Sequence, residues 1–157
     1  MHVIVATDGS RQSLAAAKEL KRIADPSRID DVTVVAVVSP LAAVSFANDL
    51  GGPLARKAKE TQEPLSFRQE AHDATTVVME QFEGWGPAVH RRIRSGSAAA
   101  EINKLAGELE ADLIVLAAGG RGLSETILLG STATRVQHSA PCPVLVVRPR
   151  RRPRKSS

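Results

Sequence analysis

The sequence predicts an α/β fold in which a single open parallel sheet has helices on both faces. Short apolar runs rich in β-branched residues alternate with segments whose apolar residues recur at helical spacing, which is the pattern of β-α-β units. Aromatic residues make up 3% of the 157 residues, so the core must be packed with Val, Ile, Leu and Ala. We expect one domain over residues 1–148, followed by a basic, disordered tail over residues 149–157.

The first half of the chain is expected to contain two strands and two helices. Residues 2–7 and 31–38 are β-branched runs that predict strands. Between them, Ser10 is placed to cap a helix over residues 11–24, which the sequence Asp-Pro-Ser then ends. After the second strand, the path of residues 41–64 is left open. A charged segment then predicts a helix that starts at residue 65 or 66 and runs to about residue 82.

The second half alternates strand and helix more regularly. Residues 88–94 (AVHRRIR) alternate apolar and basic side chains, which is typical of an exposed edge strand. Gly96 and Ser97 then precede a helix with a continuous apolar face. The remaining elements are expected at residues 98–110 (helix), 112–118 (strand), 130–139 (helix) and 143–148 (strand).

A glycine-rich segment follows the fourth strand. The apolar run 113–116 leads into residues 119–122, which include three glycines, and residues 130–132 (Gly-Ser-Thr) open the last helix. Glycines let backbone amides approach an anion, and a helix N-terminus adds unpaired N–H groups and its dipole. With the hydroxyls of Ser131 and Thr132 as extra donors, this segment is suited to hold a phosphate group.

Three segments carry a resemblance to a known family: residues 3–20 (VIVATDGSRQSLAAAKEL), residues 94–102 (RSGSAAAEI) and residues 111–149. They make the chain similar to the universal stress protein family over nearly its whole length. Nucleotide-binding members carry a glycine, two residues, a second glycine, nine residues and then Gly-Ser or Gly-Thr. Gly120 and Gly130 match the second and third positions, whereas Ala117 occupies the first. In an alternative register Gly119 and Gly122 would be the first two glycines of the motif, but only seven residues would then separate Gly122 from Gly130.

The resemblance implies a five-stranded parallel sheet ordered 3-2-1-4-5, with a ligand crevice where the winding reverses. It also implies adenine nucleotide as ligand: ATP, alone or with Mg²⁺. Asp8 would bond the ribose hydroxyls or the adenine edge, Val37 would be an apolar wall for adenine, and the start of the last helix would hold the phosphates. The implied ligand-binding residues are Ala6, Thr7, Asp8, Val37, Leu116, Ala117, Gly119, Gly120, Arg121, Gly130, Ser131, Thr132 and Ala133.

We therefore expect a cytoplasmic, ATP-binding regulatory protein of the stress response. The last strand has an apolar edge, and the resemblance implies a homodimer through Val144, Leu145, Val146 and Val147. The four histidines are scattered, without the partners of a catalytic triad or the spacing of a metal site, so we expect no enzyme beyond slow ATP hydrolysis. A single cysteine excludes an internal disulfide, and neither a signal peptide nor a membrane-spanning run is expected.

Three alternatives remain at this point. The chain could be a dimeric interaction module that has lost nucleotide binding, with Ala117 as a first step. It could associate with nucleic acid through its tail, because residues 148–157 carry six cationic side chains. A flavin-dependent electron carrier of related topology is the third.

Overall fold

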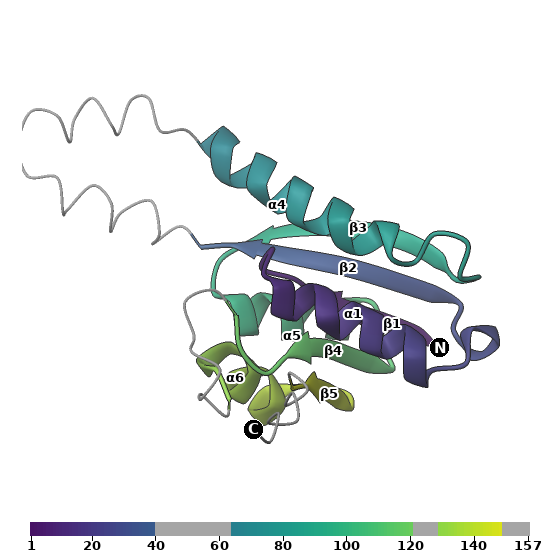
Figure 1. The fold of residues 1–157 in the computed structure, drawn as a ribbon. Coiled ribbons are helices and arrows are strands. Elements are labelled where there is room, and N and C mark those ends of the chain that lie inside the picture. Colours follow the sequence, from purple (N-terminus) through teal and green to yellow (C-terminus); the bar gives the residue numbers. More distant parts are fainter. Residues whose placement is uncertain (40–63, 121–128, 149–157) are drawn as a thin grey trace, which may run out of the picture.

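Five parallel strands form one sheet in the order β3-β2-β1-β4-β5, which confirms the predicted fold (Figure 1). The structure is a computed structural model that describes residues 1–39, 64–120 and 129–148. The predictions for residues 41–63, Arg121 and the basic tail lie outside these residues. The strands are β1 (His2–Ala6), β2 (Asp31–Val38), β3 (Ala88–Ser95), β4 (Leu113–Ala117) and β5 (Val144–Val147).

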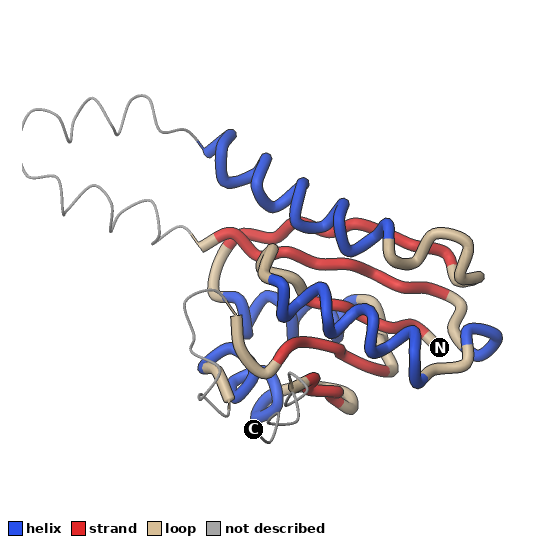
Figure 2. The backbone as a smooth tube through the Cα atoms, in the orientation of Figure 1, coloured by secondary structure: helices blue, strands red, loops and turns tan. Residues whose placement is uncertain are grey.

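Helices cover both faces of the sheet (Figures 1 and 2). On one face, α1 and α4 pack over the odd-numbered residues of the central strand, Val3 and Val5. On the other face, α5 and α6 pack over Ile4 and Ala6. This alternation follows from the period of two along a strand, and it explains why β1 is apolar at nearly every position. The helices are α1 (Arg11–Ile23), the short 3₁₀ helix η1 (Pro26–Arg28), α4 (Pro64–Glu80), α5 (Ala98–Glu108) and α6 (Ser131–Ser139).

The helix ends differ slightly from those predicted. Ser10 caps α1 as expected, its hydroxyl accepting a hydrogen bond from the Ser13 amide at 3.1 Å. The predicted stop after α1 holds a turn of 3₁₀ helix, η1. Helix α4 starts at Pro64, a position that tolerates proline, and gives way before Phe82 to a tighter turn in which residues 81 and 82 donate to carbonyls three residues back.

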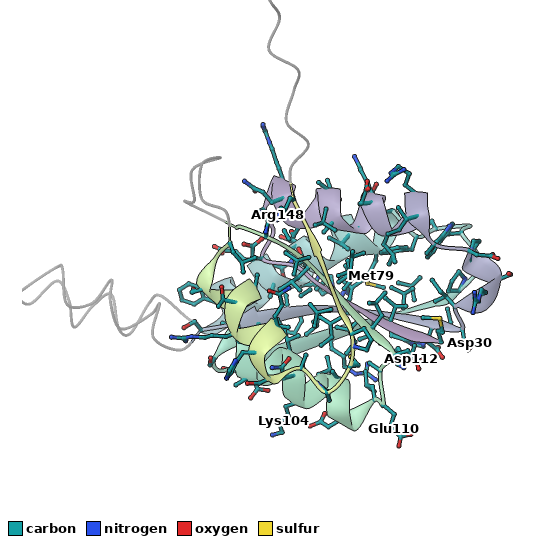
Figure 3. All side chains as sticks on the ribbon, turned by 90° about the horizontal axis from the view of Figure 1, so that it is seen from below. Asp30, Met79, Lys104, Glu110, Asp112 and Arg148 are labelled. Carbon is teal, nitrogen blue, oxygen red and sulfur yellow. The ribbon has the colours of Figure 1, made fainter. Side chains whose placement is uncertain are left out.

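The C-terminus of α5 contains an unusual backbone conformation. Glu110 has φ +48° and is the single non-glycine residue with positive φ in the described part of the chain. The amide of Ala111 donates to the carbonyl of Ala106 at 2.9 Å, and that of Glu110 donates to the carbonyl of Gly107 at 3.3 Å. This pair of hydrogen bonds defines a Schellman motif, in which the left-handed position usually belongs to glycine. Figure 3 shows the Glu110 side chain extending from the body of the protein, and it is exposed.

Replacement of Glu110 by glycine is expected to stabilise the protein by about 1 kcal/mol, because glycine removes the cost of the left-handed conformation in an L-residue. Urea denaturation of the two proteins measures the difference in the free energy of unfolding. Glu110→Ala is the matched control, since it removes the exposed carboxylate and keeps the Cβ atom. If alanine stabilises as much as glycine, the charge rather than the backbone accounts for the effect.

Candidate functional site

A cavity of about 350 Å³ opens at the carboxyl ends of the central strands. The chain runs outward from β1 through β2 to β3 and then returns to β4, so the winding reverses between β1 and β4. These two strands pair directly, with Val5 beside Val115, and the loops that follow them therefore lie next to each other.

The cavity brings the predicted site residues together. Every residue implied by the resemblance lines it except Arg121, which lies outside the described residues. They are Ala6, Thr7, Asp8, Val37, Leu116, Ala117, Gly119, Gly120, Gly130, Ser131, Thr132 and Ala133. Sequence reasoning missed five further lining residues: Ser13, Val35, Ala98, Ile102 and Ala118.

One side of the cavity is apolar. Val35 and Val37 lie on the same face of β2, and Ala98 and Ile102 lie one turn apart on α5. Side chains two residues apart on a strand share a face, so Val35 could have been predicted from Val37. The two α5 residues line the cavity because of tertiary packing, which the sequence pattern does not show. The arrangement leaves an apolar wall, suited to a flat organic ring, beside the polar residues of the cavity.

The opposite side presents hydrogen-bond donors. The N-cap of α6 is Gly130, which has no side chain to accept from the first-turn amides. Its own amide donates to the carbonyl of Ala118 at 2.6 Å and holds the helix end against the end of β4. Ser131 and Thr132 line the cavity at the positive end of the helix dipole, where first-turn amides have no partner within the helix.

The floor of the cavity is set by a close approach between Asp8 and Gly120. A Cβ atom on Gly120 would lie 2.1 Å from Oδ2 of Asp8, far inside van der Waals contact. The other carboxylate oxygen, Oδ1, accepts a hydrogen bond from the Ser10 amide at 2.9 Å. The φ of Gly120 is not in the left-handed range, so the constraint at this position is space: a side chain here would have to displace the Asp8 carboxylate.

Ala117 replaces the first glycine of the family motif without backbone strain. It ends β4 in extended conformation, and its φ is not positive. Although it also lines the cavity, its methyl group packs against the core beneath α1 and α4. In this structure the position requires no glycine.

The electrostatics of the cavity rest on the backbone. Asp8 is the single ionisable side chain among the described residues that line it. Three helices, α1, α5 and α6, contribute residues of their first turns, so their positive ends converge on the cavity. An anion held there by the described residues would be bound by main-chain amides and hydroxyls.

Other reactive groups lie away from this cavity. Within residues 1–39, 64–120 and 129–148, no three His, Cys, Asp or Glu side chains are grouped so as to hold a metal ion. Burial raises the pKa of the half-buried Cys142 thiol, which favours the protonated form. No helix in the described part of the chain is both long and apolar enough to cross a membrane.

Comparison with known proteins identifies the family. The sequence model of the Universal stress protein family matches residues 1–148. The chain belongs to this family. The universal stress protein MJ0531 of Methanocaldococcus jannaschii is 36% identical over 148 residues, which cover 93% of this chain and 81% of that protein.

Solved structures of universal stress proteins and their relatives share the fold. A structure of the protein MJ0577, used to assign a biochemical function, has a TM-score of 0.75 at 23% identity and covers 96% of this chain and 97% of that one. A universal stress protein in complex with cAMP has a TM-score of 0.57 at 24% identity, covering 94% and 97%. A family member from Arabidopsis thaliana with AMP bound has a TM-score of 0.65 at 15% identity, covering 96% and 93%.

The contact between Asp8 and Gly120 predicts a specific coupling. Gly120→Ala is expected to lower the free energy of unfolding by about 1–3 kcal/mol, because the added methyl group displaces a hydrogen-bonded carboxylate. In an Asp8→Ala background the same substitution should cost less, since the obstructing oxygen is gone. A double-mutant cycle by chemical denaturation measures this coupling, and additive effects would contradict it.

Proposed function

We propose that this universal stress protein binds an adenine nucleotide in the cavity between the ends of β1 and β4 and acts as a cytoplasmic, homodimeric regulator of the stress response. The observation that carries the proposal is that apolar residues, the Asp8 carboxylate and the first turn of α6 line one cavity. Relatives with AMP and cAMP bound support the same ligand class.

The polarity of the cavity matches the parts of a nucleotide in order. The base lies against Val35 and Val37, and Asp8 accepts hydrogen bonds from the ribose hydroxyls. The phosphates meet the first turn of α6, where Ser131 and Thr132 donate. ATP, alone or with Mg²⁺, is the proposed ligand because a triphosphate extends from the ribose toward that helix.

The proposed role is regulatory. Asp8 is the one ionisable side chain among the described cavity residues, and the proposal assigns it to the ribose rather than to a water molecule at the phosphates. We therefore propose that ATP is hydrolysed slowly at most. Binding would shift the protein toward a ligand-bound population and thereby alter a surface that a protein partner contacts.

The alternative of a nucleotide-free interaction module is less favoured. It predicts a crevice filled by side chains, whereas the described residues line a cavity of about 350 Å³. Ala117, the departure that motivated this alternative, directs its methyl group into the core. The route to nucleic acid through the basic tail involves residues outside the described part of the chain.

The free edge of β5 is the proposed dimer interface. The carbonyls of Pro143 and Val147 accept hydrogen bonds from the amides of Ile114 in β4 and of Ala118, which follows β4. In a parallel ladder alternate residues face the same neighbour, so the backbone groups of Val144 and Val146 turn toward the free edge. All four β5 residues are half-buried, which leaves apolar surface for a second copy to cover.

Isothermal titration calorimetry with ATP and Mg²⁺ tests the proposed ligand. We expect saturable binding, and the Ser131→Ala/Thr132→Ala double variant should bind about tenfold more weakly or worse, because hydroxyl donors to a charged phosphate are lost. Thr134→Ala is the matched control, since Thr134 lies on the same helix but does not line the cavity. No heat and no thermal stabilisation of the unaltered protein would reject nucleotide binding.

Light scattering after size-exclusion chromatography tests the dimer. The unaltered protein should have twice the mass of one chain, and Val146→Pro should be monomeric because proline removes an N–H group on the free edge. Val146→Thr keeps that N–H group and the side-chain shape, so it should remain dimeric. A monomeric unaltered protein would show that β5 does not serve as the interface.

A further inference from the structure

Two buried hydroxyl groups lie beneath the Asp8 turn, at the wall of the cavity. Oγ1 of Thr7 and Oγ of Ser13 are 2.8 Å apart, and the two residues are 6% and 3% exposed. Thr7 is the last residue before Asp8, whereas Ser13 belongs to the first turn of α1. The hydrogen bond therefore joins the end of the central strand to the helix that follows it.

The contacts of the pair favour one direction for its hydrogen bond. Oγ of Ser13 lies 2.9 Å from the carbonyl of Ser10, which can only accept. With the Ser13 proton in that hydrogen bond, Thr7 is the donor to Ser13. Thr7 in turn accepts a hydrogen bond from the Gly9 amide at 3.1 Å. In this arrangement both hydroxyl protons are used within the protein.

This chain of hydrogen bonds holds the turn that carries the exposed Asp8 side chain. The peptide after Asp8 is fixed by the hydrogen bond from Gly9 to Thr7, and Gly9 has a left-handed φ of +78°. The carboxylate is fixed by the hydrogen bond from the Ser10 amide to Oδ1, while the Ser10 carbonyl anchors Ser13. Removal of the Ser13 hydroxyl leaves the Thr7 proton without its acceptor in a buried setting, which frees Thr7 to rotate and release Gly9.

We propose that Ser13, acting through Thr7, is a positioning residue that makes this site selective for ribonucleotides with free 2′- and 3′-hydroxyls. This inference rests on the proposed nucleotide site. An ionised carboxylate only accepts hydrogen bonds, so Asp8 strengthens the binding of a ligand that donates hydrogen bonds, as ribose hydroxyls do. The strength of these hydrogen bonds depends on the placement of the carboxylate beside Gly120, because a rotation of the side chain would carry its oxygens out of line.

The test compares the affinities of ATP and 2′,3′-dideoxy-ATP, measured by calorimetry in the presence of Mg²⁺. In the unaltered chain ATP should bind at least about tenfold more tightly, the effect of a hydrogen bond to a charged group. In Ser13→Ala this ratio should fall below about threefold, mainly through weaker binding of ATP. Thr7→Val should give the same loss and carries the test if Ser13→Ala does not fold.

Thr75→Val is the control, because Thr75 is fully buried and its hydroxyl bonds within α4, away from the cavity. It should lose stability and keep the affinity ratio, which separates positioning from general destabilisation. A ratio that survives in Ser13→Ala and Thr7→Val overturns the role of the hydroxyl pair, as does equal binding of the two ligands by the unaltered chain. If the unaltered chain binds neither ligand, the proposed function falls and the positioning role falls with it.

Discussion

The pairing of β1 with β4 is the constraint on which the site depends. Val3, Ile4 and Val5 lie beside Leu113, Ile114 and Val115 at the reversal of the winding. These strands are central and buried on both faces, so hydrophobic packing fixes their register strongly. That register places the end of β1, with Asp8, against the end of β4, with Gly120, and the cavity is the space left above them.

Much of this arrangement could be predicted from the sequence. The alternation of apolar runs and helical segments indicates the parallel sheet, and the resemblance to a family supplies the strand order, which the structure confirms. Placement of the described site residues around one cavity follows from that topology, because the ends of neighbouring parallel strands meet. Their role in binding a nucleotide stays a prediction.

Other features depend on tertiary contacts that no local pattern encodes. Ala98 and Ile102 reach the cavity because α5 packs over β2, and nothing in the spacing of the helix indicates a ligand. Ser13 has the same sequence context as any polar residue in a first helical turn, and only its distance to Thr7 reveals the hydroxyl pair. Glu110 breaks the preference for glycine in a Schellman motif, so its backbone conformation could not be inferred from residue type.

The reliance of the cavity on backbone donors has a consequence for how such a site can change over time. A substitution deletes a side chain but leaves the peptide N–H in place, unless it introduces proline. Substitutions at the start of α6 therefore remove hydroxyl donors but keep the amide donors, while a side chain at position 120 must displace the Asp8 carboxylate. Anion recognition should weaken stepwise with changes along the helix end, whereas a change at Gly120 acts on Asp8 directly.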